Sequence, residues 1–241
     1  MDRKDFLKKG LGSLAIMPLF AACKETDVDP TDTSGSTGTD SGTGTSTGSC
    51  TTTASETEGP FPTKNPSSLV TNDITSDRAG TKLTVKITIQ NKNNSCAALA
   101  NAFVDIWHCD AAGNYSEYGG TGMQSTNYTN VHFLRGRQTT DSSGVVNFTT
   151  IYPGWYSGRA VHIHVHVYNS SGKSLLVTQI AFPEDVSKVV FAQGVYATHG
   201  QADTTNARDN VFGDGVTTEM STVTGSPSAG YALTHTIVVN G

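Results

Sequence analysis

The sequence predicts an all-β protein, an antiparallel β-sandwich with long active-site loops and little helix. Several segments alternate between apolar and polar residues, and turn-forming residues separate these segments. Convincing helical periodicity is scarce. Only 15% of the 241 residues are charged, and 25 are glycines, which is typical of proteins built from strands and turns.

The first predicted strand, residues 81–90, shows the alternation most clearly. Its apolar side chains occupy every second position: Leu83, Val85, Ile87 and Ile89. In an extended strand these positions share one face, so the pattern predicts a strand that is buried on one side.

Further strands are expected in order along the chain, at residues 102–108, 145–151, 161–168, 175–182 and 231–239. Turn signals at residues 141–144 and 169–172 separate some of them. One helical turn is expected around residues 183–191. Many short strands between turns favour the sandwich.

Residues 1–22 resemble a lipoprotein-type signal peptide. A basic head precedes a 12-residue apolar or small stretch, which is too short to span a bilayer, and the cysteine at 23 follows two alanines. We expect export to a bacterial cell envelope, at the periplasm or outer surface, and a lipid anchor on Cys23. The alternative is an ordinary secretory signal cleaved near Ala22.

Residues 23–49 are mostly Asp, Thr, Ser and Gly, so this segment is expected to be a disordered tether. The folded domain is expected at residues 50–241. Export places the remaining cysteines in an oxidising compartment. A Cys50–Cys96 disulfide is our first choice, and Cys109 is an alternative partner.

The charge of the chain argues against nucleic acid as a partner. The formal net charge is −5, and Lys and Arg are scattered beyond the first ten residues. Apart from the lipid on Cys23, no membrane contact is expected.

Three histidines, His162, His164 and His166, alternate along one predicted strand. Successive members of this set point to the same face about 7 Å apart. Two convergent imidazoles form half of a metal site, and all three could suit zinc.

Two tyrosines favour a different metal. Tyr156 lies in a Pro-Gly loop just before the histidines, and Tyr115 ends a loop that follows the strand at residues 102–108. A phenol with a pKa near 10 is a poor ligand for divalent metals, whereas ferric iron favours phenolate oxygen. Two Tyr and two His around one metal therefore point to Fe(III).

The motifs that carry these residues resemble those of the intradiol ring-cleavage dioxygenases, the family of protocatechuate 3,4-dioxygenase and catechol 1,2-dioxygenase. The similar segments are residues 107–115 (WHCDAAGNY) and 152–164 (YPGWYSGRAVHIH), Glu58-Gly59-Pro60-Phe61, and Thr178-Gln179. They follow the family's order over roughly residues 50–201. The resemblance is greatest to the exported, single-domain branch.

The resemblance implies a non-haem Fe(III) bound by Tyr115, Tyr156, His162 and His164. Tyr156 would be the tyrosinate that leaves the metal when substrate binds. Arg159 would stabilise carbanionic character on the substrate ring, and Gln179 would help to shape the pocket.

The implied reaction partners are a small aromatic diol and O2, and the implied product is a cis,cis-muconate-type diacid. Simple catechol, hydroxyquinol, protocatechuate and plant-derived polyphenol fragments all remain candidate substrates. Loops around Gly119 to Arg137 would set the preference among them.

Two rival functions remain open. One is an exported, lipid-anchored β-sandwich that only binds a carbohydrate or a protein. The other is a zinc hydrolase or lyase that uses His162, His164 and His166.

Overall fold

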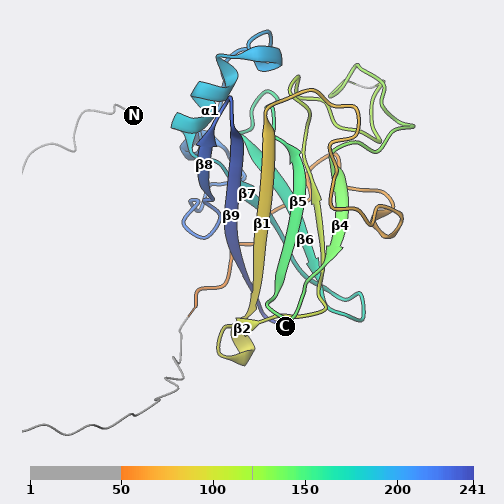
Figure 1. The fold of residues 1–241 in the computed structure, drawn as a ribbon, viewed down its shortest axis with the longest axis vertical. Coiled ribbons are helices and arrows are strands. Elements are labelled where there is room, and N and C mark those ends of the chain that lie inside the picture. The colour runs from red at the N-terminus through yellow and green to blue at the C-terminus, as the bar shows by residue number, and fades with distance from the viewer. Residues whose placement is uncertain (1–49, 121) are drawn as a thin grey trace, which may run out of the picture. The chain divides into compact units, whose positions relative to one another are not determined.

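Two β-sheets face each other in the computed structural model, which describes residues 50–241 except residue 121 (Figure 1). The expected signal peptide (1–22) and tether (23–49) lie outside the described residues. The first sheet has the order β2-β1-β9-β8, with β5 also paired to β1. Its strands are β1 (Lys82–Asn91), β2 (Ala97–Ala98), β5 (Val145–Ile151), β8 (Thr222–Ser226) and β9 (Gly230–Val239).

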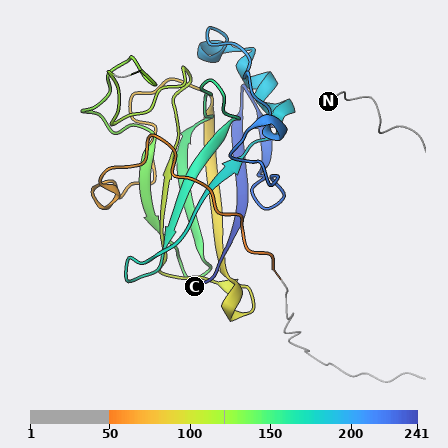
Figure 2. The ribbon, with the colours of Figure 1, turned by 180° about the vertical axis from the view of Figure 1, so that it is seen from behind.

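The second sheet has the order β4-β3-β6-β7 and lies behind the first in the view of Figure 1, as the reverse view in Figure 2 also shows. Its strands are β3 (Phe103–Trp107), β4 (Arg135–Thr139), β6 (His162–Tyr168) and β7 (Ser174–Ala181). The predicted all-β sandwich is therefore confirmed, with one difference. β1 and β9, the first and last long strands, lie side by side in one sheet and pair in parallel rather than antiparallel.

The α-helix α1 (Glu184–Phe191) forms where a helical turn was expected. In the described part of the chain, four short 3₁₀ helices accompany it: η1 (Pro66–Ser68), η2 (Lys92–Asn94), η3 (Gly194–Tyr196) and η4 (Asn206–Arg208). No helix among the described residues is long and apolar enough to cross a membrane.

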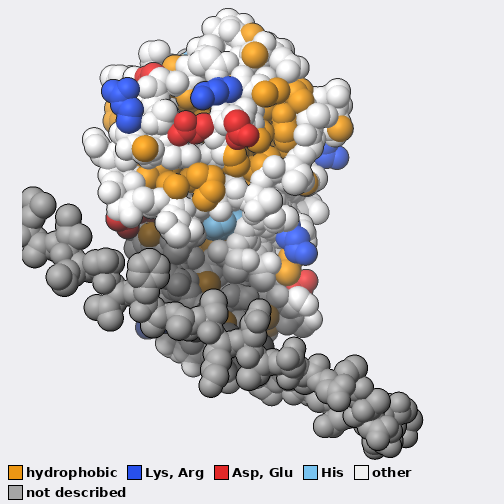
Figure 3. Space-filling view, turned by 90° about the vertical axis from the view of Figure 1, so that its left-hand side faces the viewer, with side chains coloured by type: hydrophobic (Ala, Val, Ile, Leu, Met, Phe, Trp, Pro, Cys, Tyr) orange, Lys and Arg blue, Asp and Glu red, His pale blue; other side chains and the backbone are white. Residues whose placement is uncertain are grey.

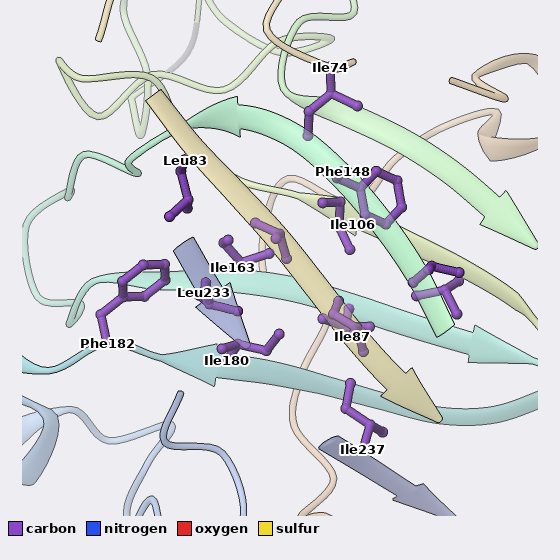
Figure 4. Packing of buried hydrophobic residues seen from close by; sticks show 14 of the residues in the cluster. Ile74, Leu83, Ile87, Ile106, Phe148, Ile163, Ile180, Phe182, Leu233 and Ile237 are labelled. Carbon is purple, nitrogen blue, oxygen red and sulfur yellow. The ribbon is translucent and has the colours of Figure 1, made fainter. Parts of the chain in front are cut away.

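The core lies between the sheets and consists of the apolar face of each strand. In β1 all four alternating apolar residues are buried, and in β6 the inward side chains are Ile163, Val165 and Val167. Figure 4 shows side chains from both sheets, including Ile87, Ile163 and Ile180, pointing toward one another. Burying these apolar surfaces away from water is the main driving force for closing the sandwich.

Three of the described strands did not stand out in the sequence, and the first of them, β2, is only two residues long. β4 has the sequence RGRQT and β8 has the sequence TVTGS, and neither alternates between apolar and polar residues. Residues 135–137, predicted as part of a pocket loop, are therefore strand. β4 is held at the sheet edge by five paired residues of β3.

The Cys50–Cys96 disulfide is formed, as predicted, and Cys109 is a buried free thiol. The bridge ties the start of the described chain to the turn after β1. On the face shown in Figure 3, charged side chains are sparse among apolar and uncharged polar ones.

Candidate metal centre

The outer face of β6 brings His162 and His164 together. Their Nε2 atoms are 3.1 Å apart, and both side chains are buried. Because side chains alternate along a strand, the residue between them, Ile163, points the other way into the core. The strand thus fixes both imidazoles on one side.

The protonation of His162 leaves Nε2 free to act as a ligand. Its Nδ1 lies 2.6 Å from the Ala160 carbonyl oxygen, which can only accept, so Nδ1 carries the proton. Burial, aided by the positive charge of Arg159, lowers the pKa of His162 to about 3. The ring is therefore neutral, and the lone pair on Nε2 points toward the ring of His164.

His164 is held by packing. Its ring stacks on Trp107 with ring centroids 4.8 Å apart, and Trp107 is its partner across the β3–β6 pair. A methyl group at Gly59 would come within 3.1 Å of the His164 ring, so the Glu58-Gly59-Pro60-Phe61 segment covers it closely. Burial lowers the pKa of His164 well below its usual value. Its Nδ1 has no hydrogen-bond partner among the described residues.

Tyr115 reaches the two histidines from the loop after β3. Its hydroxyl lies 3.3 Å from His162 Nε2, and its side chain is fully buried. The Gln124 side-chain amide accepts from the Tyr115 backbone N–H and donates to its carbonyl, at 2.6 and 2.8 Å. The ring stacks on Phe61 with centroids 4.8 Å apart. Burial raises the pKa of this phenol well above its usual value.

Tyr156 approaches from the loop that precedes β6. Its ring centroid is 5.8 Å from that of Tyr115 and 5.8 Å from that of His162. The loop can pack this closely because Gly154 lies against the Asp110 carbonyl, where a Cβ would come within 2.2 Å. Tyr156 is half-buried, so it is the more accessible of the two tyrosines.

Arg159 connects Tyr156 to its surroundings. Its guanidinium donates to the Tyr156 hydroxyl at 3.2 Å and to Gln179 Oε1 at 2.5 Å. Burial raises the pKa of Tyr156, and the nearby positive charge of Arg159 opposes that rise. Gln179 lies across from His164 in the β6–β7 pair, so it belongs to the same face.

Two residues that support the site were not predicted from the sequence. Asp209 accepts hydrogen bonds from Arg159 Nε at 2.9 and 3.0 Å and from the Ala160 backbone N–H at 2.7 Å. It lies 50 residues from Arg159, outside any local motif, so only the folded chain reveals the pairing.

The second unpredicted residue is Arg135, which is almost fully buried. It donates to the carbonyls of Phe61 and Ser116, at 2.9 and 2.7 Å, and so holds the covering segment against the Tyr115 loop. Burial lowers the pKa of Arg135 to about 10, and the Glu117 carboxylate, 3.8 Å away, opposes the shift. Its position in a strand without apolar alternation gave no signal.

His166 does not join the other two histidines. Its Nε2 lies 2.8 Å from Ser174 Oγ, and its Nδ1 lies 2.8 Å from the Tyr168 hydroxyl and 3.0 Å from Glu58. In the described part of the chain, no cluster of three metal-binding His, Cys, Asp or Glu side chains includes it. A zinc site built from three histidines of β6 therefore has no geometric support.

The donor set at this place fits a hard trivalent metal. The Nε2 of His164 and the Tyr115 hydroxyl oxygen lie 3.1 and 3.3 Å from His162 Nε2, and the ring of Tyr156 lies beside these three donors. His162 also has the hydrogen-bonded second nitrogen that is typical of a metal-binding histidine. Phenolate oxygen favours Fe(III) over zinc.

Comparison with known proteins gives consistent results. The family model described as "Dioxygenase" matches residues 58–241. The protocatechuate 3,4-dioxygenase beta chain of Burkholderia cepacia is 36% identical over 93 residues, which are 35% of this chain. That match spans 38% of the length of the curated relative.

Solved structures extend the likeness to most of the chain. An intradiol ring-cleavage dioxygenase from Tetranychus urticae has a TM-score of 0.71 and 27% identity, covering 79% of this chain and 95% of that one. The dioxygenase domain of a carbohydrate-binding fusion protein from Streptomyces sp. SirexAA-E has a TM-score of 0.56 and 25% identity. That alignment covers 78% of this chain and 97% of the domain.

Proposed function

Because the chain belongs to the intradiol ring-cleavage dioxygenase family, we propose that it opens catechol-type rings with O2 at a ferric ion held by Tyr115, Tyr156, His162 and His164. One observation carries this proposal: His162 Nε2 lies 3.1 Å from His164 Nε2 and 3.3 Å from the Tyr115 hydroxyl oxygen. These three groups come from β6 and from a loop 47 residues away.

The ligand set explains why iron would be needed. Burial raises the pKa of Tyr115 well above its usual value, so its phenol stays protonated until a strongly charged cation displaces the proton. Bound Fe(III) would supply a Lewis acid that draws electron density from a chelated catecholate and makes its ring reactive toward O2.

Tyr156 is suited to accept a proton from the incoming diol. It is half-buried, and the Arg159 guanidinium donates to its hydroxyl oxygen at 3.2 Å. A hydrogen bond from a permanent cation stabilises a phenolate. If a diol took the place of Tyr156, the Tyr156 oxygen would accept one of the two diol protons and keep Arg159 as a hydrogen-bond donor, and solvent would take up the other proton.

Arg159 is also suited to stabilise negative charge on the substrate ring. Asp209 and Gln179 hold its guanidinium on either side, so it needs little reorganisation when charge develops. A guanidinium stays charged and does not act as a base.

An aromatic wall beside the donors favours an aromatic substrate. Phe61, Trp107, Cys109 and Tyr115 form one buried cluster, and Tyr118 and Tyr156 pack against it. A flat ring entering beside Tyr156 would meet apolar surfaces while its two hydroxyls face the polar donors. Both atoms of O2 would be inserted where the bond between the hydroxylated carbons breaks, so the muconate-type diacid contains every atom of the diol and of O2.

We also propose that the domain acts outside the cytoplasm, tethered by a lipid on Cys23. The Cys50–Cys96 disulfide supports this, because such bridges persist in oxidising compartments.

The test is to load the purified protein with iron, record its visible spectrum, and add catechol, protocatechuate or hydroxyquinol in air. We expect a red to burgundy protein, O2 uptake, and a product that carries both oxygen atoms of isotopically labelled dioxygen. A colourless protein that binds zinc in preference to iron, or no O2 uptake with any aromatic diol, would reject the proposal.

A further inference from the structure

A second cluster of metal-binding side chains lies away from the candidate iron site. One carboxylate oxygen from each of Glu56, Asp214 and Glu219 lies within 4.8 Å of the other two. Within the described residues, none of these carboxylates forms an ion pair with a Lys, Arg or His side chain. The cluster therefore brings three carboxylates together without a cation in direct contact. The positive charge of Arg159 acts on Glu56 only from a distance, where it partly opposes the rise in the pKa of Glu56.

Glu219 is the unusual member, because it is fully buried. Its Oε1 lies 3.4 Å from the Thr178 hydroxyl, whereas its Oε2 has no hydrogen-bond partner among the described residues. Burial and the charges of Glu56 and Asp214 raise the pKa of Glu219 to about 8. A buried carboxylate oxygen without a partner is unfavourable unless a cation or a proton satisfies it.

The cluster is separate from the iron site although both touch β7. Thr178 and Gln179 are successive residues of this strand, so their side chains point to opposite faces. Gln179 contacts Arg159 at the iron site, whereas Thr178 contacts Glu219.

We propose that Glu56, Asp214 and Glu219 bind a calcium-sized divalent cation. Calcium takes oxygen ligands at about 2.3–2.6 Å, so two ligands on opposite sides of the ion are about 4.6–5.2 Å apart. The three oxygens lie within 4.8 Å of one another, so all three can reach one such ion. Asp214 is exposed, which gives the ion a path from solvent and leaves room for water ligands.

The cation would join two chain segments that support the iron site. Ala54 donates to Thr218 Oγ1 at 3.0 Å, which already links the segments that carry Glu56 and Glu219. The segment that carries Glu56 continues to Thr57, whose carbonyl accepts a hydrogen bond from the Gln179 side-chain amide at 2.9 Å. The segment that carries Asp214 and Glu219 follows Asp209, which forms the ion pair with Arg159. This inference is independent of the reaction proposed above.

The test uses the iron-loaded protein, freed of calcium with EGTA and titrated with CaCl2 by calorimetry. We expect one ion per chain, with a Kd on the order of 10⁻⁴–10⁻³ M, and a thermal midpoint that rises with calcium. Asp214→Asn should weaken binding by about tenfold or more, because it removes an anionic ligand at an exposed position. Asp185→Asn changes the net charge equally, away from the cluster, and should bind as the wild type does.

Glu219→Gln gives an opposite pair of effects. It should abolish the response to calcium, yet raise the thermal midpoint in calcium-free buffer at a pH above about 8, where Glu219 is ionised and the substitution removes the repulsion among the three carboxylates. The proposal is overturned if the wild type binds no calcium at 10 mM or below (about ten times the weakest expected Kd). It is also overturned if magnesium binds as tightly, or if Asp214→Asn binds as Asp185→Asn does. The visible band of the iron site reports separately whether the proposed oxygenase centre is intact.

Discussion

Asp209 and Arg159 form a buried ion pair across 50 residues of sequence, with Arg159 Nε 2.9 and 3.0 Å from the two carboxylate oxygens. The Asp209 side chain is fully buried, and that of Arg159 is 11% exposed. Asp209 also accepts from the backbone N–H groups of Ala160 and Val211. It therefore fixes both the guanidinium and the chain just before β6.

Asp209→Asn should lower kcat and leave the iron content unchanged. The amide keeps the size of the side chain but loses the charge that orients Arg159, and we expect a loss of about 10- to 100-fold, or about 1.4–2.7 kcal/mol in the barrier. Steady-state O2 uptake would separate kcat from KM. Asp203→Asn is the control, because this exposed carboxylate lies in the same segment and contacts Ser157 and Gly158. Equal losses in both variants would refute a specific role for Asp209.

Tyr156→Phe should weaken the visible absorption band of the iron-loaded protein and slow substrate binding. The variant removes one phenolate oxygen and the acceptor of the Arg159 hydrogen bond. Stopped-flow spectra after mixing with catechol without O2 would measure both effects. Tyr118→Phe is the matched control, because the Tyr118 hydroxyl donates to the Pro62 carbonyl and leaves the donor set untouched. An unchanged spectrum in Tyr156→Phe would remove this residue from the ligand set.

His162→Ala should lose most of its iron, whereas His166→Ala should keep it. His162 Nε2 is the atom on which the other donors converge, whereas both ring nitrogens of His166 are engaged by Ser174, Tyr168 and Glu58. Metal analysis of the purified variants measures this difference. If the two variants lose metal equally, the three-histidine site regains support.

Much of this site could be predicted because its residues lie in strands and short motifs. The alternation around His162 and His164 fixed their shared face, and the Pro-Gly turn before Tyr156 indicated that it would lie near. Tyr115 was identified by the motif after the strand at residues 102–108. The structure brings all four side chains together.

The rest depends on tertiary contacts that local sequence does not encode. Asp209 reaches Arg159 from a loop beyond α1, and Arg135 is a buried cation in a strand without an apolar face. The parallel pairing of β1 with β9 joins segments 147 residues apart at the contact between Thr84 and the Tyr231 carbonyl. These long-range contacts form only when the two sheets pack together in the complete domain.

Gly59→Ala should displace the ring of His164 and weaken iron binding, whereas Gly172→Ala should not. Gly59 has a φ of +68°, and an added Cβ would lie 3.1 Å from His164 Cε1. Gly172→Ala is the control, because its φ is +83° with nothing within 4 Å. Each should lose about 1–2 kcal/mol of stability from the left-handed backbone, as measured by denaturant unfolding. Only Gly59→Ala should also weaken iron binding, and equal iron affinities would contradict a role for this contact.

The buried His108 should make the stability of the iron-free protein depend on pH. Its Nδ1 donates to the Cys109 carbonyl at 2.9 Å, and its Nε2 accepts from Thr150 Oγ1 at 2.8 Å, so the neutral ring is fully satisfied. Burial lowers the pKa of His108 to about 4 in the folded protein. The unfolded chain, with a pKa near 6.5, therefore binds more protons between these values.

The contribution of His108 to stability should be complete above about pH 6.5 and should be lost as the pH falls toward about 4. About two and a half pKa units correspond to about 3 kcal/mol between roughly pH 8 and pH 4. Urea unfolding of the wild type and of His108→Gln, both iron-free, would measure it, because the glutamine amide does not titrate in this range. The free-energy difference between them should shrink by about 3 kcal/mol over this range. Parallel pH profiles would show that His108 is not held neutral by the fold.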